Sequence, residues 1–494
     1  MTRQGLLGIR RRRPFGRHAL TACGLLVLAC VAVAAYHSFK PLPEGLSAAM
    51  PVREQGEVRF LADDTWVDAS GQRRTEHHIF DRVLALIGGA ERLIVLDMFL
   101  LNDFAGEADG DDMRSLSDEV TAALVDRKRA RPEMSIILIT DPINTLYGGV
   151  VNDNLERLER AGVDVVITRL GALRDPNPAW SGLWRICCQW LGDAPESGWL
   201  PNPVGDQAVP LRSLLAMLNF KANHRKTLVA DTPGGWVGLV TSGNPHDASS
   251  AHGNVAVEFT GPAALDLLET ERAVVRFSRP GLVWPEPPEP RPSGAERHDG
   301  TRIQVLTEAA ILEQVLALLG RADSGDSIDL AMFYLSHRGV VGALKAAHRR
   351  GVQVRVLLDP NQGAFGRRKN GVPNQPVADE LVAAGIPVRW CTTRGEQCHS
   401  KFMLYRSAVG SAAFIAGSAN YTRRNLDDLN LETSVLVEGS RQTPVMRDAA
   451  VFFDRRWSNR GDRRYSLPYT EHGDAGRLRY WQYRITEATG LSTF

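Results

Sequence analysis

Apolar runs alternate with amphipathic stretches along most of this chain. In the first half an amphipathic stretch at residues 82–87 precedes an apolar run at 93–99, and the same order returns at 314–319 and 328–334. Continuous apolar runs of this length are typical of strands buried on both faces, and the amphipathic spacing predicts helices between them. The pattern therefore predicts an α/β fold with a largely parallel sheet in each half.

The likeness between the two halves continues beyond these elements. The next apolar run of each half ends in the dipeptide Asp-Pro, at residues 141–142 and 359–360, where a turn should end a strand. A helix end capped by glycine follows at Gly162 and at Gly385. The chain therefore repeats one α/β unit, and we expect two such domains side by side.

A proline-rich segment separates the halves. Residues 280–293 have the sequence PGLVWPEPPEPRPS, and proline at this density interrupts both helices and sheets. We expect a first domain at 52–279, a linker at 280–298 and a second domain at 299–494.

The first half is longer because it carries an insert at about residues 171–210. It holds four of the ten tryptophans, namely Trp180, Trp184, Trp190 and Trp199. Segments rich in tryptophan suit a membrane interface. The other interpretation is a loop packed over the domain.

The N-terminus combines a basic segment with an apolar one. Residues 1–18 hold six arginines and no acid, and residues 19–36 are uncharged and long enough to span a bilayer. Positive charge before the span predicts a retained anchor in a bacterial-type inner membrane, with a periplasmic body. The alternatives are a signal cleaved near Ala34 or Ala35, which would give a secreted or periplasmic protein, lipidation at Cys30, and a buried helix of a cytosolic protein.

Composition and charge restrict the function classes. With 44% hydrophobic and 23% charged residues the chain is globular, which excludes a disordered, collagen-like or multi-span membrane protein. The formal charge is +1, but after the basic segment 52 basic side chains face 57 acidic ones. A nucleic-acid binder that relies on bulk electrostatics is more basic, so only a local basic groove would serve that function. Of the six cysteines, Cys391 and Cys398 form a disulfide in an oxidising compartment or remain two free thiols.

Both halves end in similar polar blocks. The first has the sequence NHRKTLVAD at 223–231 and the second CHSKFMLYR at 398–406. In an extended strand a histidine and a lysine two residues apart share one face, so both reach the same ligand. Lysine suits phosphate oxygens, and histidine acts as nucleophile, acid or base near neutral pH. The repetition of the pair predicts one phosphate-directed site.

This arrangement resembles the phospholipase D superfamily over about residues 75–460. His-x-Lys and a later Ser-x-Asn occur in both α/β halves, and in the first half an aspartate follows the lysine after four more residues. The serine follows a glycine in the second half, as in the family pattern, but Thr241 in the first. The layout is similar to the cardiolipin synthase and phosphatidylserine synthase group. The resemblance implies two domains, each a mostly parallel mixed sheet flanked by helices, with the active site at their interface. It implies no metal ion and no cofactor.

The resemblance also implies roles by position. His224 attacks phosphorus and forms a phosphohistidine, and His399 protonates the leaving alcohol, although the pseudo-symmetry leaves the exchanged assignment open. The expected catalytic set is His224, Lys226, Asp231, His399 and Lys401. The expected supporting set is Ser242, Asn244, Glu258, Ser418, Asn420 and Glu432. In that set the asparagines donate to phosphoryl oxygens, the serines support the network and each glutamate orients an imidazole.

A few residues depart from the pattern or stand outside it. Arg406 occupies the place of the second aspartate, on the strand face opposite His399, where we expect local support rather than chemistry. His246 and His252 are expected on the cleft rim. The basic loop at residues 363–369 is expected either to touch an anionic head group or to remain solvated.

These features favour a membrane-attached phosphodiesterase that hydrolyses phospholipids or transfers their phosphatidyl group. Its partners would be a phospholipid, the membrane surface, and water or an alcohol as acceptor. The alternative is a nuclease of the same superfamily that acts on single-stranded nucleic acid outside the cytoplasm, with a basic groove and stacking aromatic residues. A non-catalytic scaffold is disfavoured because both histidine–lysine pairs are intact.

Overall fold

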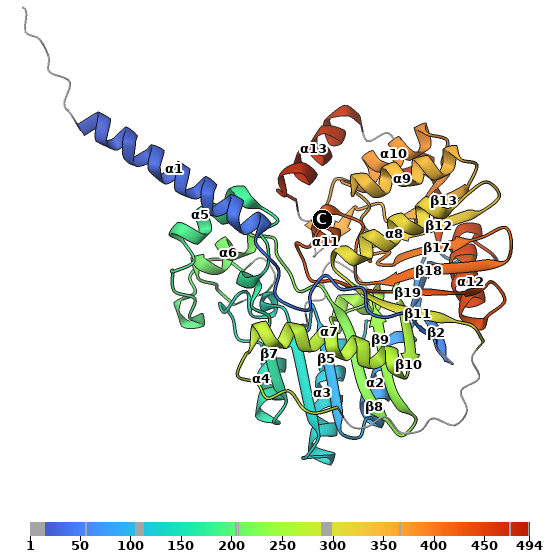
Figure 1. Ribbon diagram of the computed structural model, residues 1–494, viewed down its shortest axis with the longest axis horizontal. Coiled ribbons are helices and arrows are strands. Elements are labelled where there is room, and N and C mark those ends of the chain that lie inside the picture. Colours follow the sequence, from blue (N-terminus) through green and yellow to red (C-terminus); the bar gives the residue numbers. More distant parts are fainter. Residues whose placement is uncertain are drawn as a thin grey trace, which may run out of the picture.

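Two large sheets, one from each half of the chain, pack face to face in the computed structural model (Figure 1). The structure describes residues 15–54, 57–103, 113–202, 205, 207–287, 299–364, 367–473, 476–492 and 494. Most of the predicted basic segment 1–18, and residues 288–298 of the predicted linker, lie outside the described residues. The predicted domain boundaries remain predictions.

The first sheet has seven strands that all come from the first half. Their spatial order is β2 (Val58–Ala62), β10 (Val255–Thr260), β9 (Gly235–Thr241), β8 (Lys226–Thr232), β5 (Leu93–Met98), β6 (Ser135–Thr140) and β7 (Asp164–Ile167).

The second sheet has nine strands, and the edge strand β1 comes from the N-terminal part of the chain. The spatial order is β1 (Arg53–Glu54), β11 (Arg302–Thr307), β19 (Thr433–Ser440), β18 (Ser411–Gly417), β17 (Lys401–Arg406), β12 (Ser327–Met332), β13 (Gln353–Leu358), β16 (Val388–Cys391) and β20 (Ser466–Pro468). Two hairpins stand apart: β3 (Asp64–Val67) with β4 (Arg73–Glu76), and β14 (Gly363–Ala364) with β15 (Arg367–Arg368).

The α/β class with duplicated mixed sheets is confirmed, but the predicted balance of strand directions is wrong. Only β5, β6 and β7 run parallel in the first sheet, and only β12, β13 and β16 in the second. The other neighbours are antiparallel. The apolar runs gave the wrong strand directions because both faces of each sheet are buried. Helices cover one face, and the second sheet covers the opposite face. This burial produces the same uninterrupted apolar pattern as a parallel sheet.

Helices cover the outer face of each sheet. The first sheet carries α2 (Ile79–Gly89), α3 (Leu116–Ala130) and α4 (Asp153–Arg160), and the second carries α8 (Ala309–Arg321), α9 (Arg338–Arg349) and α10 (Asn374–Ala383). Two further helices contact strands of both sheets, α7 (Pro262–Ser278) and α12 (Pro444–Ser458). The short α11 (Arg423–Leu426) and the C-terminal α13 (Gly476–Thr489) complete the second half. In the described part of the chain, 3₁₀ turns lie at Pro142–Thr145, Leu170–Ala172, Pro195–Ser197, Asp247–Ala251 and Tyr469–Glu471.

Strand alternation divides the core into three clusters. On β17, Phe402 and Leu404 face the other sheet, whereas Met403 faces the outer helices. On β5, Val95 faces the other sheet and Leu96 faces α2 and α3. This two-residue period places apolar side chains in both layers. The central cluster therefore joins both halves into one body.

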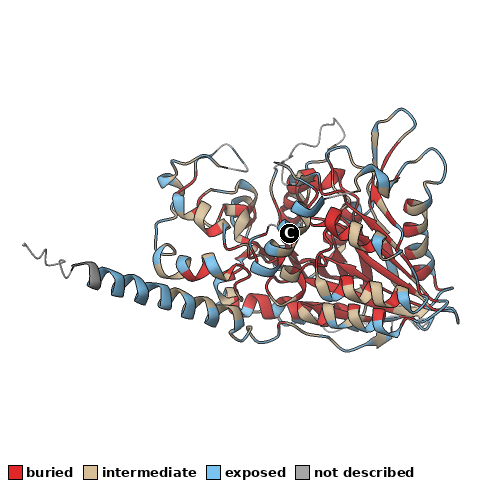
Figure 2. Ribbon diagram, turned by 90° about the horizontal axis from the view of Figure 1, so that it is seen from above, coloured by how far each residue is buried: buried red, intermediate tan, exposed pale blue. Residues whose placement is uncertain are grey.

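The N-terminal helix α1 (Phe15–Phe39) projects from this body (Figures 1 and 2). Residues 18–39 are long and apolar enough to cross a membrane, which fits an anchor or a signal sequence. The end of α1 nearest the body packs on α5 (Pro178–Cys187), the helix of the tryptophan-rich insert, and α6 (Leu211–Met217) follows the insert.

Candidate active site

The two histidine–lysine pairs lie where the carboxyl ends of the parallel strands meet the starts of β8 and β17. Because β8 and β17 run antiparallel to their neighbours β5 and β12, Lys226 lies opposite Met98, and Lys401 lies opposite Met332. The carboxyl ends of parallel strands are where α/β folds place their sites.

Each histidine is held by the main chain of the other half. His224 N donates to the carbonyl oxygen of Leu431 at 2.9 Å, and His399 N donates to that of Gly253 at 2.9 Å. The two contacts are equivalent, so they relate the halves by an approximate twofold arrangement. This crossing brings both histidine–lysine pairs into one site, where their charges interact.

Glu432 of the second half faces the imidazole of His224. Its Oε1 lies 2.9 Å from Nδ1 of His224, and it accepts hydrogen bonds from Ser418 and Asn425. Burial alone would raise the pKa of Glu432, but His224 and Lys226 outweigh burial and lower it. The ionised carboxylate holds the proton on Nδ1 of the imidazole and leaves the Nε2 lone pair available.

His399 has an amide in the equivalent place. Its Nδ1 lies 3.1 Å from Oδ1 of Asn254, which also accepts a hydrogen bond from Ser242 at 3.1 Å. Asn254 is thus the structural counterpart of Glu432, and sequence reasoning missed it. The spacing hides the match, because Asn254 follows its serine by 12 residues and Glu432 follows Ser418 by 14.

Glu258 does not reach an imidazole, so the prediction that it orients one is wrong. Its carboxylate forms two contacts with Arg82, at 2.5 and 2.8 Å, and a longer one of 3.8 Å with Arg59. The physical reason is its position on β10, four residues and therefore about 13 Å along the strand from Asn254.

A lysine and a phenylalanine accompany each histidine. Nζ of Lys226 donates to the main-chain oxygen of His224 at 2.6 Å and lies 5.1 Å from the ring centre of Phe99. For Lys401 the equivalent distances are 2.8 Å to the oxygen of its own histidine and 5.2 Å to Phe333. The two phenylalanine rings lie 4.9 and 5.0 Å from the imidazoles. Both rings are themselves buried.

Burial is the largest cause that lowers the pKa of all four of these basic groups. The pKa of His224 falls to about 4 and that of Lys226 to about 7. Burial and neighbouring positive charges lower the pKa of His399 and of Lys401 well below their usual values. The imidazoles are therefore uncharged at neutral pH, and an anion entering the site would favour the charged lysines.

Two aspartates that the sequence assigned only to turns support both strands. Oδ2 of Asp141 accepts the N–H of Asn223 at 2.7 Å, and Oδ2 of Asp359 accepts the N–H of Cys398 at 2.8 Å. Burial raises the pKa of each aspartate to about 7. Each fixes the residue that precedes a histidine, and the repeated Asp-Pro dipeptide is the signal that could have found them.

Asp231 lies at the far end of β8, so its predicted place in the catalytic set is corrected. Its Oδ1 accepts the N–H groups of Arg92 and Leu93, both at 2.8 Å, where β5 begins. Five residues separate it from Lys226, about 17 Å along a strand. Arg406, at the matching end of β17, instead pairs with the buried Asp329, as expected of local support.

The two motif asparagines are both buried. Oδ1 of Asn244 accepts the N–H of Leu100 at 3.3 Å. Oδ1 of Asn420 has no hydrogen-bond partner among the described residues. An unpartnered buried amide is a polar group that a bound ligand would satisfy.

The predicted rim histidines are buried instead. The ring of His252 lies 5.8 Å from that of His399, and Nδ1 of His252 accepts the N–H of Gln397 at 3.2 Å. His246 is buried as well, because the 3₁₀ turn Asp247–Ala251 folds this loop against the body.

The cysteines of the body are paired. Cys391 is bonded to Cys398, which ties β16 to the residue before His399, and Cys187 is bonded to Cys188. No group of three or more metal-ligating side chains gathers within the part of the chain that the structure describes.

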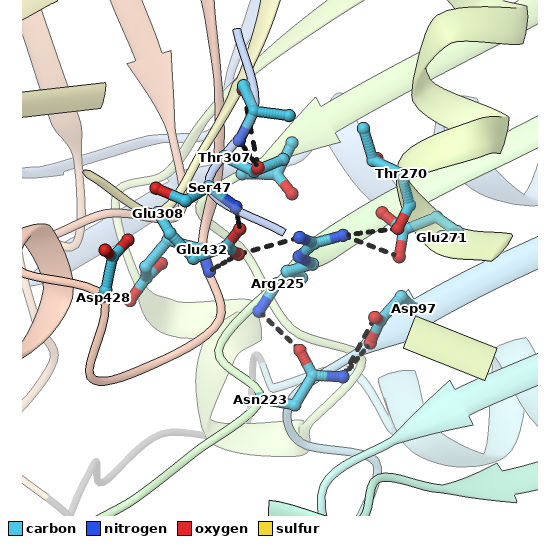
Figure 3. Close-up of polar contacts among 12 residues, drawn as sticks. Ser47, Asp97, Asn223, Arg225, Thr270, Glu271, Thr307, Glu308, Asp428 and Glu432 are labelled. Atoms are coloured by element: carbon cyan, nitrogen blue, oxygen red, sulfur yellow. Dashed lines mark hydrogen bonds and ion pairs between the residues drawn. The ribbon is translucent and has the colours of Figure 1, made fainter. Parts of the chain in front are cut away.

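Arg225, between His224 and Lys226, lies at the centre of a polar cluster that joins the halves (Figure 3). Its guanidinium is fully buried and lies 2.8 Å from Glu308 and 3.4 Å from Glu271. Glu308 also accepts the N–H of Glu432 at 3.0 Å. Through Glu308, the buried Arg225 thus connects the start of β8, which holds His224, to Glu432, which faces the imidazole of His224.

Replacing Arg225 with methionine is expected to lower the free energy of unfolding by about 3–5 kcal/mol, because two buried carboxylates lose their partner. Unfolding in urea measures this loss. Arg92→Met is the matched control, since Arg92 pairs with Asp231 at 3.3 Å but is half exposed, and we expect a loss of about 1 kcal/mol or less. Equal losses in the two variants would show that Arg225 does not hold the halves together.

Known proteins resemble this chain in both sequence and fold. Residues 315–457 match the family described as cardiolipin synthase, PLD-like domain. Mitochondrial cardiolipin hydrolase of Homo sapiens is 28% identical over 184 residues, which cover 35% of this chain and 65% of that protein. The protein of the same name from Mus musculus is 26% identical over 166 residues, which cover 34% of this chain and 66% of that protein. The chain thus spans about two thirds of the length of these relatives.

The fold is similar to the crystal structure of phosphatidylserine synthase from Haemophilus influenzae Rd KW20. The TM-score is 0.53 at 10% sequence identity, and the match covers 90% of this chain and 96% of that one. The family match and the two cardiolipin hydrolases are similar to this chain in sequence, and the synthase is similar to it in fold. Residues 315–457 are a phospholipase D-like domain by sequence, and the comparisons together support the phospholipase D superfamily for this chain.

Proposed function

We propose that this protein is a membrane-attached phosphodiesterase or phosphatidyltransferase that acts on phospholipids through a phosphohistidine. The observation that carries the proposal is the contact of His224 with Glu432 across the two halves, beside a second histidine–lysine pair. The names of the relatives, which refer to cardiolipin and phosphatidylserine, support a phospholipid substrate.

In the first step Nε2 of His224 attacks phosphorus and the bond from phosphorus to the leaving alcohol breaks. His399 gives its proton to that alcohol, and the charge of the bound phosphate favours this protonated state. The phosphorylated ring of His224 keeps its Nδ1 proton and is cationic, so Glu432 stabilises it. This is the reason for assigning the attack to His224, whose partner is a carboxylate, rather than to His399.

In the second step His399 removes a proton from water or from an alcohol. The oxygen of that acceptor attacks phosphorus, and the bond to Nε2 of His224 breaks. Lys226 and Lys401 neutralise the non-bridging oxygens in both steps. Water as acceptor gives hydrolysis and an alcohol gives transfer.

The full chain, reconstituted in vesicles of mixed phospholipids with chelator and glycerol, tests this function. Mass spectrometry of the lipids should show phosphatidic acid or phosphatidylglycerol formed from other lipids. If the lipids remain unchanged while the protein cleaves bis(p-nitrophenyl) phosphate, the lipid substrate is wrong. If the same protein also cleaves single-stranded DNA, the nuclease function replaces the proposed lipid function.

For the membrane attachment we propose that α1 is the anchor and that the insert lies in the membrane interface beside it. A side chain at Gly182 on α5 would meet the main-chain oxygen of Cys30 at 2.6 Å, so only glycine permits this close contact. Cys30 precedes the end of α1 at Phe39 by nine residues, about 13 Å along the helix. If α1 spans the bilayer with its body periplasmic, this contact lies below the outer head groups, so α5 enters the outer leaflet beside α1.

Two tryptophans of the insert are largely exposed. Trp190 is 76% exposed and Trp199 is 71% exposed, although α5 itself is packed on α1. Large aromatic rings of this kind gather at membrane interfaces. The insert is therefore both a folded unit and a surface that suits head groups.

Replacing Trp190 and Trp199 with serine is expected to lower the quenching of tryptophan fluorescence by brominated phospholipids about twofold, because these rings would contact the lipid. The measurement uses the full chain in vesicles. Trp284→Phe, at a half-buried tryptophan next to α7, is the control and should leave the quenching unchanged. Equal quenching in the serine variant and the unmodified protein would show that the insert stays clear of the lipid.

A further inference from the structure

The C-terminal helix α13 carries an apolar stripe on its exposed side. Leu478 is 84% exposed, Trp481 is 60% exposed and Ile485 is 56% exposed. Residues three and seven positions apart lie on one side of a helix, so these side chains form one continuous surface. We call these three residues the α13 face.

The opposite side of α13 is fixed to the body. The hydroxyl of Tyr483 donates to the main-chain oxygen of Ser336 at 2.8 Å, and the carboxylate of Glu487 accepts the N–H of Arg423 at 3.0 Å. The side chains of Tyr483 and Glu487 are buried. Because these contacts hold the helix from its other side, the α13 face points away from the body.

Arginines flank the α13 face on either side. They are Arg477, Arg479 and Arg484, and within the described part of the chain none of them forms an ion pair with a carboxylate. The hydrogen bonds of Arg479 and Arg484 go to uncharged side chains. The sequence of the helix holds one acid, Glu487, which lies on the buried side. An apolar stripe with tryptophan and leucine beside arginines is the pattern of helices that lie in the interface of an anionic membrane.

The end of α13 adjoins the tryptophan-rich insert. A side chain at Gly490, the residue after the helix, would meet the main-chain oxygen of Pro176 at 1.7 Å, so the two segments touch. Pro176 precedes α5 by two residues, and α5 packs on α1. Figure 1 shows α13 on the side of the body that carries α1 and α5. The α13 face therefore continues the membrane interface proposed for the insert.

The predicted basic loop at residues 363–369 also lies beside α13. Asn370, which follows this loop directly, donates from Nδ2 to Oε1 of Gln482 at 3.0 Å. The loop has the sequence GAFGRRK and holds no acid. It therefore adds positive charge next to α13, where an anionic head group is one of its two expected contacts.

We propose that the α13 face is a second membrane-docking surface, which takes the anionic head-group region of the bilayer that α1 crosses. The insert contacts this bilayer from the first half of the chain, and α13 contacts it from the second. A single anchor helix leaves the body free to tilt, whereas a contact from each half fixes how the active site is presented to the lipid. The inference rests on the proposed membrane attachment through α1.

Site-directed spin labelling of the full chain in vesicles tests this surface. Cys23 and Cys30 are replaced with serine, and a nitroxide is attached at Leu478→Cys, since the other four cysteines are paired. In vesicles of phosphatidylcholine and phosphatidylglycerol in equal parts, lipid favours collisions with oxygen over collisions with a neutral nickel chelate. We expect the ratio of the two collision rates to be at least about threefold higher at Leu478 than at Val409→Cys.

Val409 is the matched control, because it is 92% exposed and lies in the turn between β17 and β18. Equal ratios at the two positions would overturn the proposal. Spin–spin broadening at Leu478 together with a low ratio would assign the α13 face to a second copy of the chain, and would overturn it as well.

The charge of the surface has its own test. Replacing Arg477 and Arg484 with glutamine is expected to lower the ratio at Leu478 at least about twofold in the same vesicles, because each arginine near an anionic surface is attracted to it. Arg447→Gln removes an exposed arginine from α12 and should leave the ratio unchanged. An unchanged ratio in the double variant, or an equal fall in the control, would refute an anionic partner.

Kinetics separate the docking surface from the lipid chemistry. Replacing Trp481 and Ile485 with serine should raise KM for phosphatidylglycerol in vesicles about tenfold, and should leave the hydrolysis of soluble bis(p-nitrophenyl) phosphate unchanged. A chain that cleaves lipid but shows equal collision ratios refutes the surface and keeps the function. A chain whose Leu478 label lies in lipid but that cleaves no lipid refutes the function and keeps the surface. A chain that does not remain with the vesicles refutes both the anchor and the surface.

Discussion

Replacing either His224 or His399 with alanine is expected to lower turnover by at least about 10³-fold, because one histidine carries the phosphoryl group and the other moves the proton. Thermal unfolding should change little, since the strands that hold both residues are fixed by main-chain contacts with the other half. The rate of bis(p-nitrophenyl) phosphate hydrolysis and the unfolding temperature measure both effects. His77→Ala, which removes a histidine bonded to Ser250 outside the site, is the control. Retained activity in either site variant would rule out a mechanism that needs both histidines.

The two histidine variants should also differ from each other. The p-nitrophenolate ion leaves without needing a proton, so the first step does not depend on His399 with this substrate. His399→Ala should release about one equivalent of nitrophenolate and stop with the p-nitrophenyl phosphoryl group on His224. His224→Ala should show no such burst. A burst from the His224 variant and none from the His399 variant would exchange the two roles.

Replacing Glu432 with glutamine is expected to lower kcat about 10³-fold with little change in KM, because the amide keeps the shape of the carboxylate but no longer stabilises a cationic imidazole. The contact at 2.9 Å with Nδ1 of His224 is the basis of this expectation. Steady-state kinetics over a range of substrate concentrations separate kcat from KM.

Glu258→Gln is the matched control for that variant. The sequence gives Glu258 the same expected role, but the structure pairs it with Arg82 and Arg59. We expect kcat to stay within about twofold of the unmodified value, as for a residue that touches no reacting group. A loss of kcat as large as that of Glu432→Gln would show that Glu258 has a role in catalysis.

The difference between Glu432 and Asn254 gives the two halves unequal chemistry. A carboxylate beside one imidazole favours its cationic form, whereas an amide beside the other accepts a hydrogen bond without charge. A duplicated site in which both histidines had the same partner would give no structural reason to assign their roles. In the proposed mechanism this difference, a carboxylate in one half and an amide in the other, is the reason for assigning the attack to His224.

The sequence by itself predicted the main elements of both sheets and a site directed at phosphate. Apolar runs and amphipathic spacing depend on neighbours along the chain, so they predicted β5, β6, β12 and β13 and the helices before them. The repeated histidine–lysine pair is also local, because two residues on one strand share a face whatever surrounds the strand.

Only the tertiary structure decided which residues complete the site. Glu432 reaches His224 because the main chain at Leu431 crosses to the strand of the other half, and no spacing within one motif reports such a crossing. The same crossing brings Asn254 to His399 and leaves Glu258 on the strand beyond it. Strand direction could not be predicted for a related reason. A strand buried between a sheet and helices has the same apolar pattern as a strand buried between two layers of helices. Contacts between distant segments depend on the packing of the whole core, and that packing has no local signature in the chain.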